Sequence, residues 1–81
     1  MSVTYYVALP FLEADGALVP GQAQECTSEV AAIRRADAMS RNAPNVGALA
    51  FKRSGDPNLG SYADATILRT FGDVPKNIDE L

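Results

Sequence analysis

Residues 3–12 read VTYYVALPFL, and this stretch decides the fold. It is rich in β-branched and aromatic residues, and its alternate positions are apolar or aromatic, as in a strand with one buried face. The residues on that face are Val3, Tyr5, Val7, Leu9 and Phe11. Because Pro10 has no backbone N–H to donate, we expect the distal end of the strand to lie at a sheet edge or beside a bulge.

A turn and a less regular segment follow this strand. The dipeptide Asp15-Gly16 favours the positive φ angles that tight hairpins need. Pro20-Gly21 then interrupts residues 17–26. Residues 22–26 predict a short second strand after the interruption.

A helix is predicted next. Thr27 or Ser28 can cap its free N–H groups, and Glu29 complements the positive end of its dipole. The helix should end at about Asn42, because Pro44 disfavours a helical conformation at the residue before it. The apolar face comprises Ala32, Ile33, Ala36, Met39 and Ala43. The opposite face carries Arg34, Asp37 and Arg41.

Two more strands complete the predicted order. Residues 46–53 form the first of them, with Leu49 and Phe51 on one face and three smaller residues on the other. Residues 54–61 are dense in turn residues and are interpreted as a hairpin connection. Residues 62–71 form the last strand, whose shared face is Ala65, Ile67, Arg69 and Phe71. Residues 74–81 are expected to be a loosely ordered tail with one helical turn.

The chain therefore reads as a single α+β domain over residues 1–81. Its ββαββ order predicts a single antiparallel sheet of about four strands with one amphipathic helix packed on one face. One helix covers only part of such a sheet. The uncovered face would carry Tyr6, Ala8 and Leu68, or the residues opposite them, depending on the register. Incomplete covering indicates a partner.

The composition removes most kinds of chemistry. The 81 residues include no histidine, no tryptophan and a single cysteine, Cys26. Histidine-activated nucleophiles, histidine zinc sites and CxxC redox pairs are therefore excluded. We expect a chain that is not an enzyme and has no catalytic residue, metal or cofactor, with Cys26 a partly buried and unreactive thiol.

Charge is unevenly distributed along the chain. Residues 34–53 hold five basic residues against Asp37 alone, which makes +4, whereas residues 1–33 hold four acidic residues and no basic one, which makes −4. The net charge of −3 and the absence of a helix-turn-helix or aromatic RNA-binding pattern argue against a nucleic-acid partner. The basic stretch could instead match an acidic surface on another protein or on another copy of this one.

Nothing in the sequence predicts a membrane partner. No stretch approaches 18 apolar residues, and the N-terminus lacks the basic and apolar regions of a signal peptide. The unpaired Cys26 fits a reducing compartment, so we expect a cytoplasmic protein.

Three segments carry a resemblance. Residues 31–36 (AAIRRA), 47–51 (GALAF) and 71–75 (FGDVP) together resemble short uncharacterised bacterial proteins. The resemblance spans about the whole chain and implies a free-standing small domain.

The leading hypothesis for function is a small non-enzymatic protein-interaction module that associates with itself as a homodimer. The candidate interaction surface consists of Tyr6, Leu68, Arg34, Arg41, Lys52 and Arg53. The alternative is a small-molecule-binding regulatory domain that uses the N-terminus of the helix and the 54–61 loop.

Overall fold

The computed structural model describes residues 3–56, 58–62 and 65–75, which form one antiparallel sheet and one helix packed against it. The elements in chain order are β1 (Val3–Ala14), β2 (Ala17–Pro20), β3 (Gln24–Cys26), α1 (Glu29–Arg41), β4 (Gly47–Asp56), β5 (Ser61–Tyr62) and β6 (Thr66–Gly72). The predicted α+β class is confirmed.

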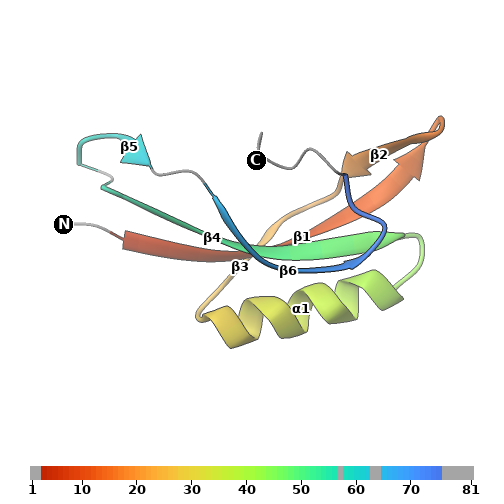
Figure 1. The fold of residues 1–81 in the computed structure, drawn as a ribbon, viewed down its shortest axis with the longest axis horizontal. Helices are drawn as coiled ribbons and strands as arrows, with labels where there is room; N and C mark the ends of the chain where they lie inside the picture. Colours follow the sequence, from red (N-terminus) through yellow and green to blue (C-terminus); the bar gives the residue numbers. More distant parts are fainter. Residues whose placement is uncertain (1–2, 57, 63–64, 76–81) are drawn as a thin grey trace.

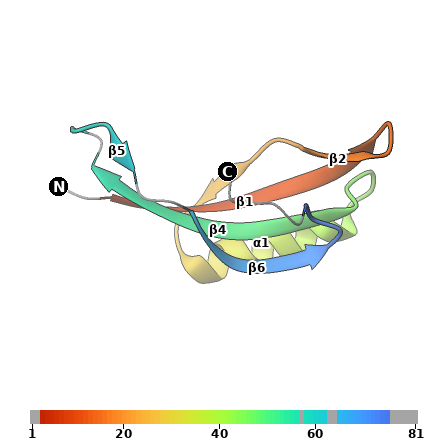
Figure 2. The same ribbon diagram turned by 45° about the horizontal axis from the view of Figure 1, so that its top comes forward.

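The sheet is built around the pairing of β1 with β4 (Figure 1). Their register is continuous from Val3 opposite Gly55 to Phe11 opposite Gly47. Both β2 and β3 pair with the other side of β1, and both β5 and β6 pair with the other side of β4. The six strand segments therefore occupy four positions across the sheet, as the sequence predicts. Figure 2 shows α1 lying on one side of this sheet.

The hairpin between β1 and β2 forms where the sequence predicts it. Asp15 and Gly16 have φ angles of 53° and 80° and link the paired residues Ala14 and Ala17. Two central residues with positive φ match the right-handed twist of the flanking strands.

The break between β2 and β3 lies opposite Pro10. The Pro10 carbonyl accepts a hydrogen bond from the Gly21 N–H at 2.8 Å, so the Pro10 nitrogen also points toward this neighbour. Ala8 pairs with Gln24 and Phe11 pairs with Pro20, so two residues of β1 oppose three of the neighbouring segment. This extra residue makes the bulge expected beside a proline that cannot donate.

Helix α1 is capped at both ends. The Ser28 side chain accepts a hydrogen bond from the Ala31 N–H at 3.1 Å. At the other end the Asn45 side-chain amide donates to the Met39 carbonyl at 3.0 Å. The chain leaves the helix at Asn42, which is extended, and Ala43 is exposed. The expected place of Ala43 on the apolar face is therefore wrong, because helical periodicity ends before it.

The last predicted strand is divided and irregular. It consists of β5 and β6, and a register shift between Ala50 and Phe51 leaves Leu68 as an extra residue in β6. This bulge reverses the alternation, so Ile67 lies with Phe51 on one face and Phe71 with Ala48 on the other. The prediction that Ile67 and Phe71 share a face is therefore wrong. Of the predicted tail over 74–81, only Val74 and Pro75 lie within the described residues.

Side chains of different size are buried on the two faces of the sheet. Five of the six buried residues between sheet and helix are alanines, and the cluster is Ala8, Ala32, Ala36, Met39, Ala48 and Ala50. The buried cluster on the face away from α1 is Leu9, Phe11 and Leu49, with Phe51, Ile67 and Val74 packed against it. The small alanine side chains allow α1 to approach the sheet closely, and the larger Tyr6, Leu68 and Phe71 pack against this cluster while only partly buried.

We expect Gly47→Ala to destabilise the fold. A β-carbon at Gly47 would overlap the backbone of Asp73, whose N–H donates to the Val46 carbonyl at 3.0 Å. Overpacking against backbone should lower the free energy of unfolding by about 1–3 kcal/mol, measured by urea denaturation. The control is Gly60→Asn, since Gly60 has φ 66° and open space around it and asparagine tolerates this conformation. Equal stability of Gly47→Ala and the wild type would contradict the close approach.

Replacing Ser28 tests the start of α1. Ser28→Ala removes the acceptor for the Ala31 N–H and should reduce stability by about 1 kcal/mol in thermal or chemical unfolding. Ser28→Asp retains a capping oxygen and should stay close to the wild type. If both variants lost the same stability, the cap would not be the cause.

Candidate interaction surface

The six residues predicted to form an interaction surface are dispersed in the structure. Tyr6 and Leu68 pack against the alanine cluster beneath α1. They therefore lie on the face that the helix covers. The sequence left open whether the uncovered face carries these residues or their neighbours along the strands, and the structure places the neighbours there. The register of β1 with β4, together with the bulge at Leu68, decides this outcome.

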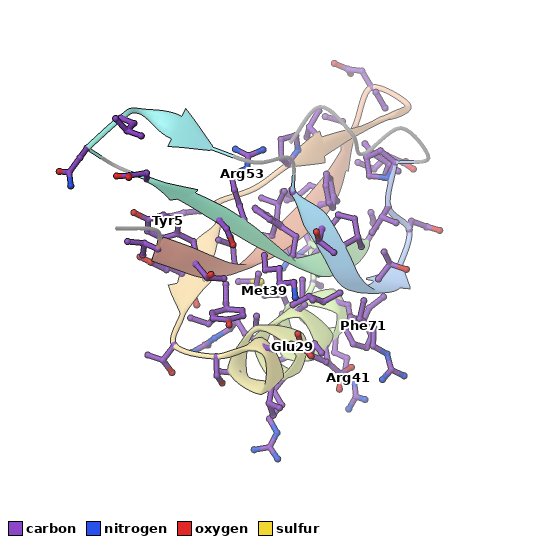
Figure 3. All side chains as sticks on the ribbon, turned by 60° about the vertical axis from the view of Figure 1, so that its left-hand side comes forward. Tyr5, Glu29, Met39, Arg41, Arg53 and Phe71 are labelled. Carbon is purple, nitrogen blue, oxygen red and sulfur yellow. The ribbon has the colours of Figure 1, made fainter. Side chains whose placement is uncertain are left out.

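The basic residues of this set point in different directions. Lys52 is the ladder partner of Tyr6 on the helix side, and Arg53, the next residue, faces the other way beside Tyr5. Figure 3 shows Arg53 on the side of the sheet away from α1 and Arg41 on the helix side. Arg34 and Arg41 are exposed on α1, and Arg41 pairs with Asp37 at 3.2 Å. The basic stretch of the sequence therefore does not form one patch.

An apolar row crosses the face away from α1. Val7 pairs with Phe51, and Phe51 pairs with Ile67, so these three side chains lie side by side on adjacent strands. We call Val7, Phe51 and Ile67 the apolar row. All three are half-buried. The sequence alone predicts the strand faces that carry Val7 and Phe51, but it does not predict that Ile67 joins them. Ile67 does so because of the bulge at Leu68, and the alternation of residues along the predicted strand does not reveal a bulge.

Neither edge of the sheet favours pairing with another strand. The outer edge formed by β2 and β3 is interrupted between Pro20 and Gln24. The β6 edge carries the bulge and Arg69, whose guanidinium carbon lies 5.5 Å from the centre of the Phe71 ring. Bulges, proline and charged side chains are the features that protect sheet edges from association. The face with the apolar row is the better candidate for contact.

The described residues offer little for catalysis or metal binding. Among them no pocket opens and no group of three potential metal-ligating side chains comes together. Cys26 is half-buried, with its Sγ 3.7 Å from the Gln24 carbonyl oxygen. Across the described ranges, no helix is long and apolar enough to cross a membrane.

The two parts of the alternative ligand site are separated. Helix α1 starts just after Cys26. Cys26 and Lys52 are the ladder partners of Tyr6 on its two sides, so they lie at the same height along the strands. The predicted loop over 54–61 is shorter than expected, because its first three residues belong to β4 and Ser61 belongs to β5. The turn therefore begins beyond Asp56, which lies four residues along β4 from Lys52, or about 13 Å at the usual strand rise. In that turn the Asp56 carboxylate accepts from the Asn58 N–H at 2.9 Å, which is the local turn bonding expected of such a connection.

Comparison with known proteins adds no relative. No protein family, no curated protein and no solved structure matches the chain.

We expect Leu68→Asp to destabilise the domain itself. Leu68 packs against the cluster beneath α1, so an aspartate there should lower the free energy of unfolding by about 1–3 kcal/mol. The control is Val30→Asp, on an α1 side chain that is 58% exposed, which should change stability by no more than about 0.5 kcal/mol. If Leu68→Asp were as stable as the control in urea denaturation, Leu68 would not belong to the core.

Proposed function

We propose that this chain is a non-enzymatic protein-interaction module that associates with itself through the sheet face away from α1. The observation that carries the proposal is the distribution of side-chain size. The fully buried leucines and phenylalanine of the sheet, Leu9, Leu49 and Phe11, lie on the face without a helix, and Phe51 and Ile67 pack against them there. Five of the six buried residues between sheet and helix are alanines, with Tyr6, Leu68 and Phe71 partly buried beside them. A sheet with two apolar faces is most stable when both faces are covered.

The apolar row is the centre of the proposed surface. Its three side chains come from three adjacent strands and are half-buried, so a partner placed over them would remove further apolar area from water. A chain of 81 residues buries a smaller share of its surface than a larger domain does. Association is one of the usual ways in which small domains compensate for a small core.

A second copy is the simplest partner for such a face. In a two-fold dimer the same patch occurs on both subunits, so an apolar row on one copy meets an apolar surface on the other. A cytoplasmic location stays a prediction, resting on the unpaired Cys26.

Light scattering behind size exclusion tests this proposal. The wild type is expected to run as a dimer, and Ile67→Lys should raise its dissociation constant at least about tenfold, because the variant buries an unpaired charge in the contact. The matched control is Val30→Lys, which adds the same charge on the helix side at an exposed position and should leave the dimer intact.

Circular dichroism should show that both lysine variants keep the fold, since a lysine on a half-buried strand position can extend its ammonium group into water. A wild type that stays monomeric at high concentration would refute self-association. A dimer weakened equally by Ile67→Lys and Val30→Lys would refute the assignment of the face.

A further inference from the structure

The turn between β1 and β2 places an aspartate directly before a glycine at the tip of an exposed hairpin (Figure 1). Asp15-Gly16 is the one place in the sequence where a glycine follows an aspartate or an asparagine. Both residues are exposed, and a β-carbon built at Gly16 would meet no atom within 4 Å in the described part of the chain. The Gly16 nitrogen is therefore not shielded from the Asp15 side chain by any neighbouring group of that part.

The conformation of this turn is one peptide rotation away from another standard hairpin turn. Asp15 and Gly16 have φ angles of 53° and 80°, and two positive values are typical of a type I′ turn. A type II′ turn has a similar φ of about 60° at its first central residue, but a ψ of about −120° there and a negative φ at the second. Rotation of the peptide unit between the two residues converts one type into the other, and glycine adopts either sign of φ. The flanking pair, Ala14 with Ala17, can stay in place, since both types connect two-residue hairpins.

The rotated turn brings the Asp15 side chain to the next backbone nitrogen. In an L residue, a ψ of about −120° aligns the bond from Cα to Cβ with the bond to the following nitrogen, so that Cγ comes within reach of that nitrogen. The peptide unit that must rotate carries the Asp15 carbonyl and the Gly16 N–H. Within the described turns and loops, neither group takes part in a backbone hydrogen bond, so the rotation breaks none there. The hairpin thus fixes the φ of Asp15, and Gly16 permits the ψ, that closure of a five-membered ring requires.

We propose that Asp15 is a site of spontaneous isoaspartate formation. The Gly16 nitrogen attacks Cγ of the protonated Asp15 carboxyl group and loses its proton, the carboxyl OH leaves as water, and the new N–Cγ bond closes a succinimide. Water then opens this ring at one of its two carbonyl carbons. Attack at Cγ returns aspartate, whereas attack at the main-chain carbon breaks its bond to nitrogen and leaves a chain that runs through Cβ and Cγ. One water is released and one is consumed, so the mass is unchanged.

The modification acts on the outer strand of the sheet. Isoaspartate adds one atom to the backbone of a two-residue turn in which Ala14 pairs with Ala17. Because the type and length of the turn fix the register of a hairpin, the longer backbone should weaken the pairing of β2 with β1. In the described sheet β2 pairs with β1 and with no other strand, so this turn controls how firmly β2 is held. The modification is independent of the proposed self-association.

A pair of variants that differ only in handedness at position 16 tests the proposal. Residues 1–25 can be synthesised as a thioester and ligated to residues 26–81 at Cys26, the single cysteine. Gly16→D-alanine favours the positive φ of the observed turn, whereas Gly16→Ala with L-alanine favours the negative φ of the rotated turn and has the same atoms around the nitrogen. The L-alanine variant should form isoaspartate about tenfold faster than the D-alanine variant, because an alanine of the wrong hand resists the rotation. Peptide mapping by liquid chromatography and mass spectrometry measures both rates after incubation at neutral pH.

The wild type should accumulate isoaspartate at position 15, while Asp37, which lies within α1, serves as the internal control and stays unmodified. A folded wild type without isoaspartate, under conditions in which the urea-unfolded chain forms it, would overturn the proposal, since the native turn would then prevent ring closure. Equal rates in the two alanine variants, with circular dichroism showing that both are folded, would overturn the peptide rotation as the route. If either variant failed to fold, the comparison of folded with unfolded wild type would still decide whether Asp15 is modified in the native turn.

Discussion

The pairing of β1 with β4 is the constraint on which the rest of the structure depends. Its register runs without a break from Val3 opposite Gly55 to Phe11 opposite Gly47. Because side chains alternate along a strand, a slip of one residue would exchange the two faces of the sheet. This one ladder therefore places Ala8, Ala48 and Ala50 beneath the helix and Leu9, Phe11 and Leu49 on the other side.

The division of side-chain size follows from what each face must pack against. A helix lies close to a sheet only where the side chains between them are small. An alanine side chain also loses almost no conformational entropy when it is buried. Larger side chains are buried on the other face, where Leu9, Phe11 and Leu49 form the cluster and Phe51 and Ile67 are only partly buried. The incomplete burial of this second layer is the physical basis for the proposed association.

Irregular positions in the outer strands limit how the domain can associate. Pro10 and the break opposite it interrupt one edge, and the bulge at Leu68 with the neighbouring Arg69 interrupts the other. Such edges are poor templates for strand addition. The same bulge moves Ile67 to the face away from α1, so one irregularity both weakens the edge and completes the apolar row.

The sequence by itself determined the elements whose signals are local: the alternation of residues 3–12, the turn at Asp15-Gly16, the cap at Ser28 and the alanine stripe of α1. These signals also determined the α+β class and the four positions across the sheet. Only the tertiary structure decided which face the helix covers, because that choice depends on packing between distant segments. The tertiary structure also decided that Leu68 is a bulge residue, since the register of β4 with β6 depends on residues far apart in the sequence. It likewise decided that the basic stretch divides between helix and sheet, since the pairing of β4 with β1 sets which way Lys52 and Arg53 point.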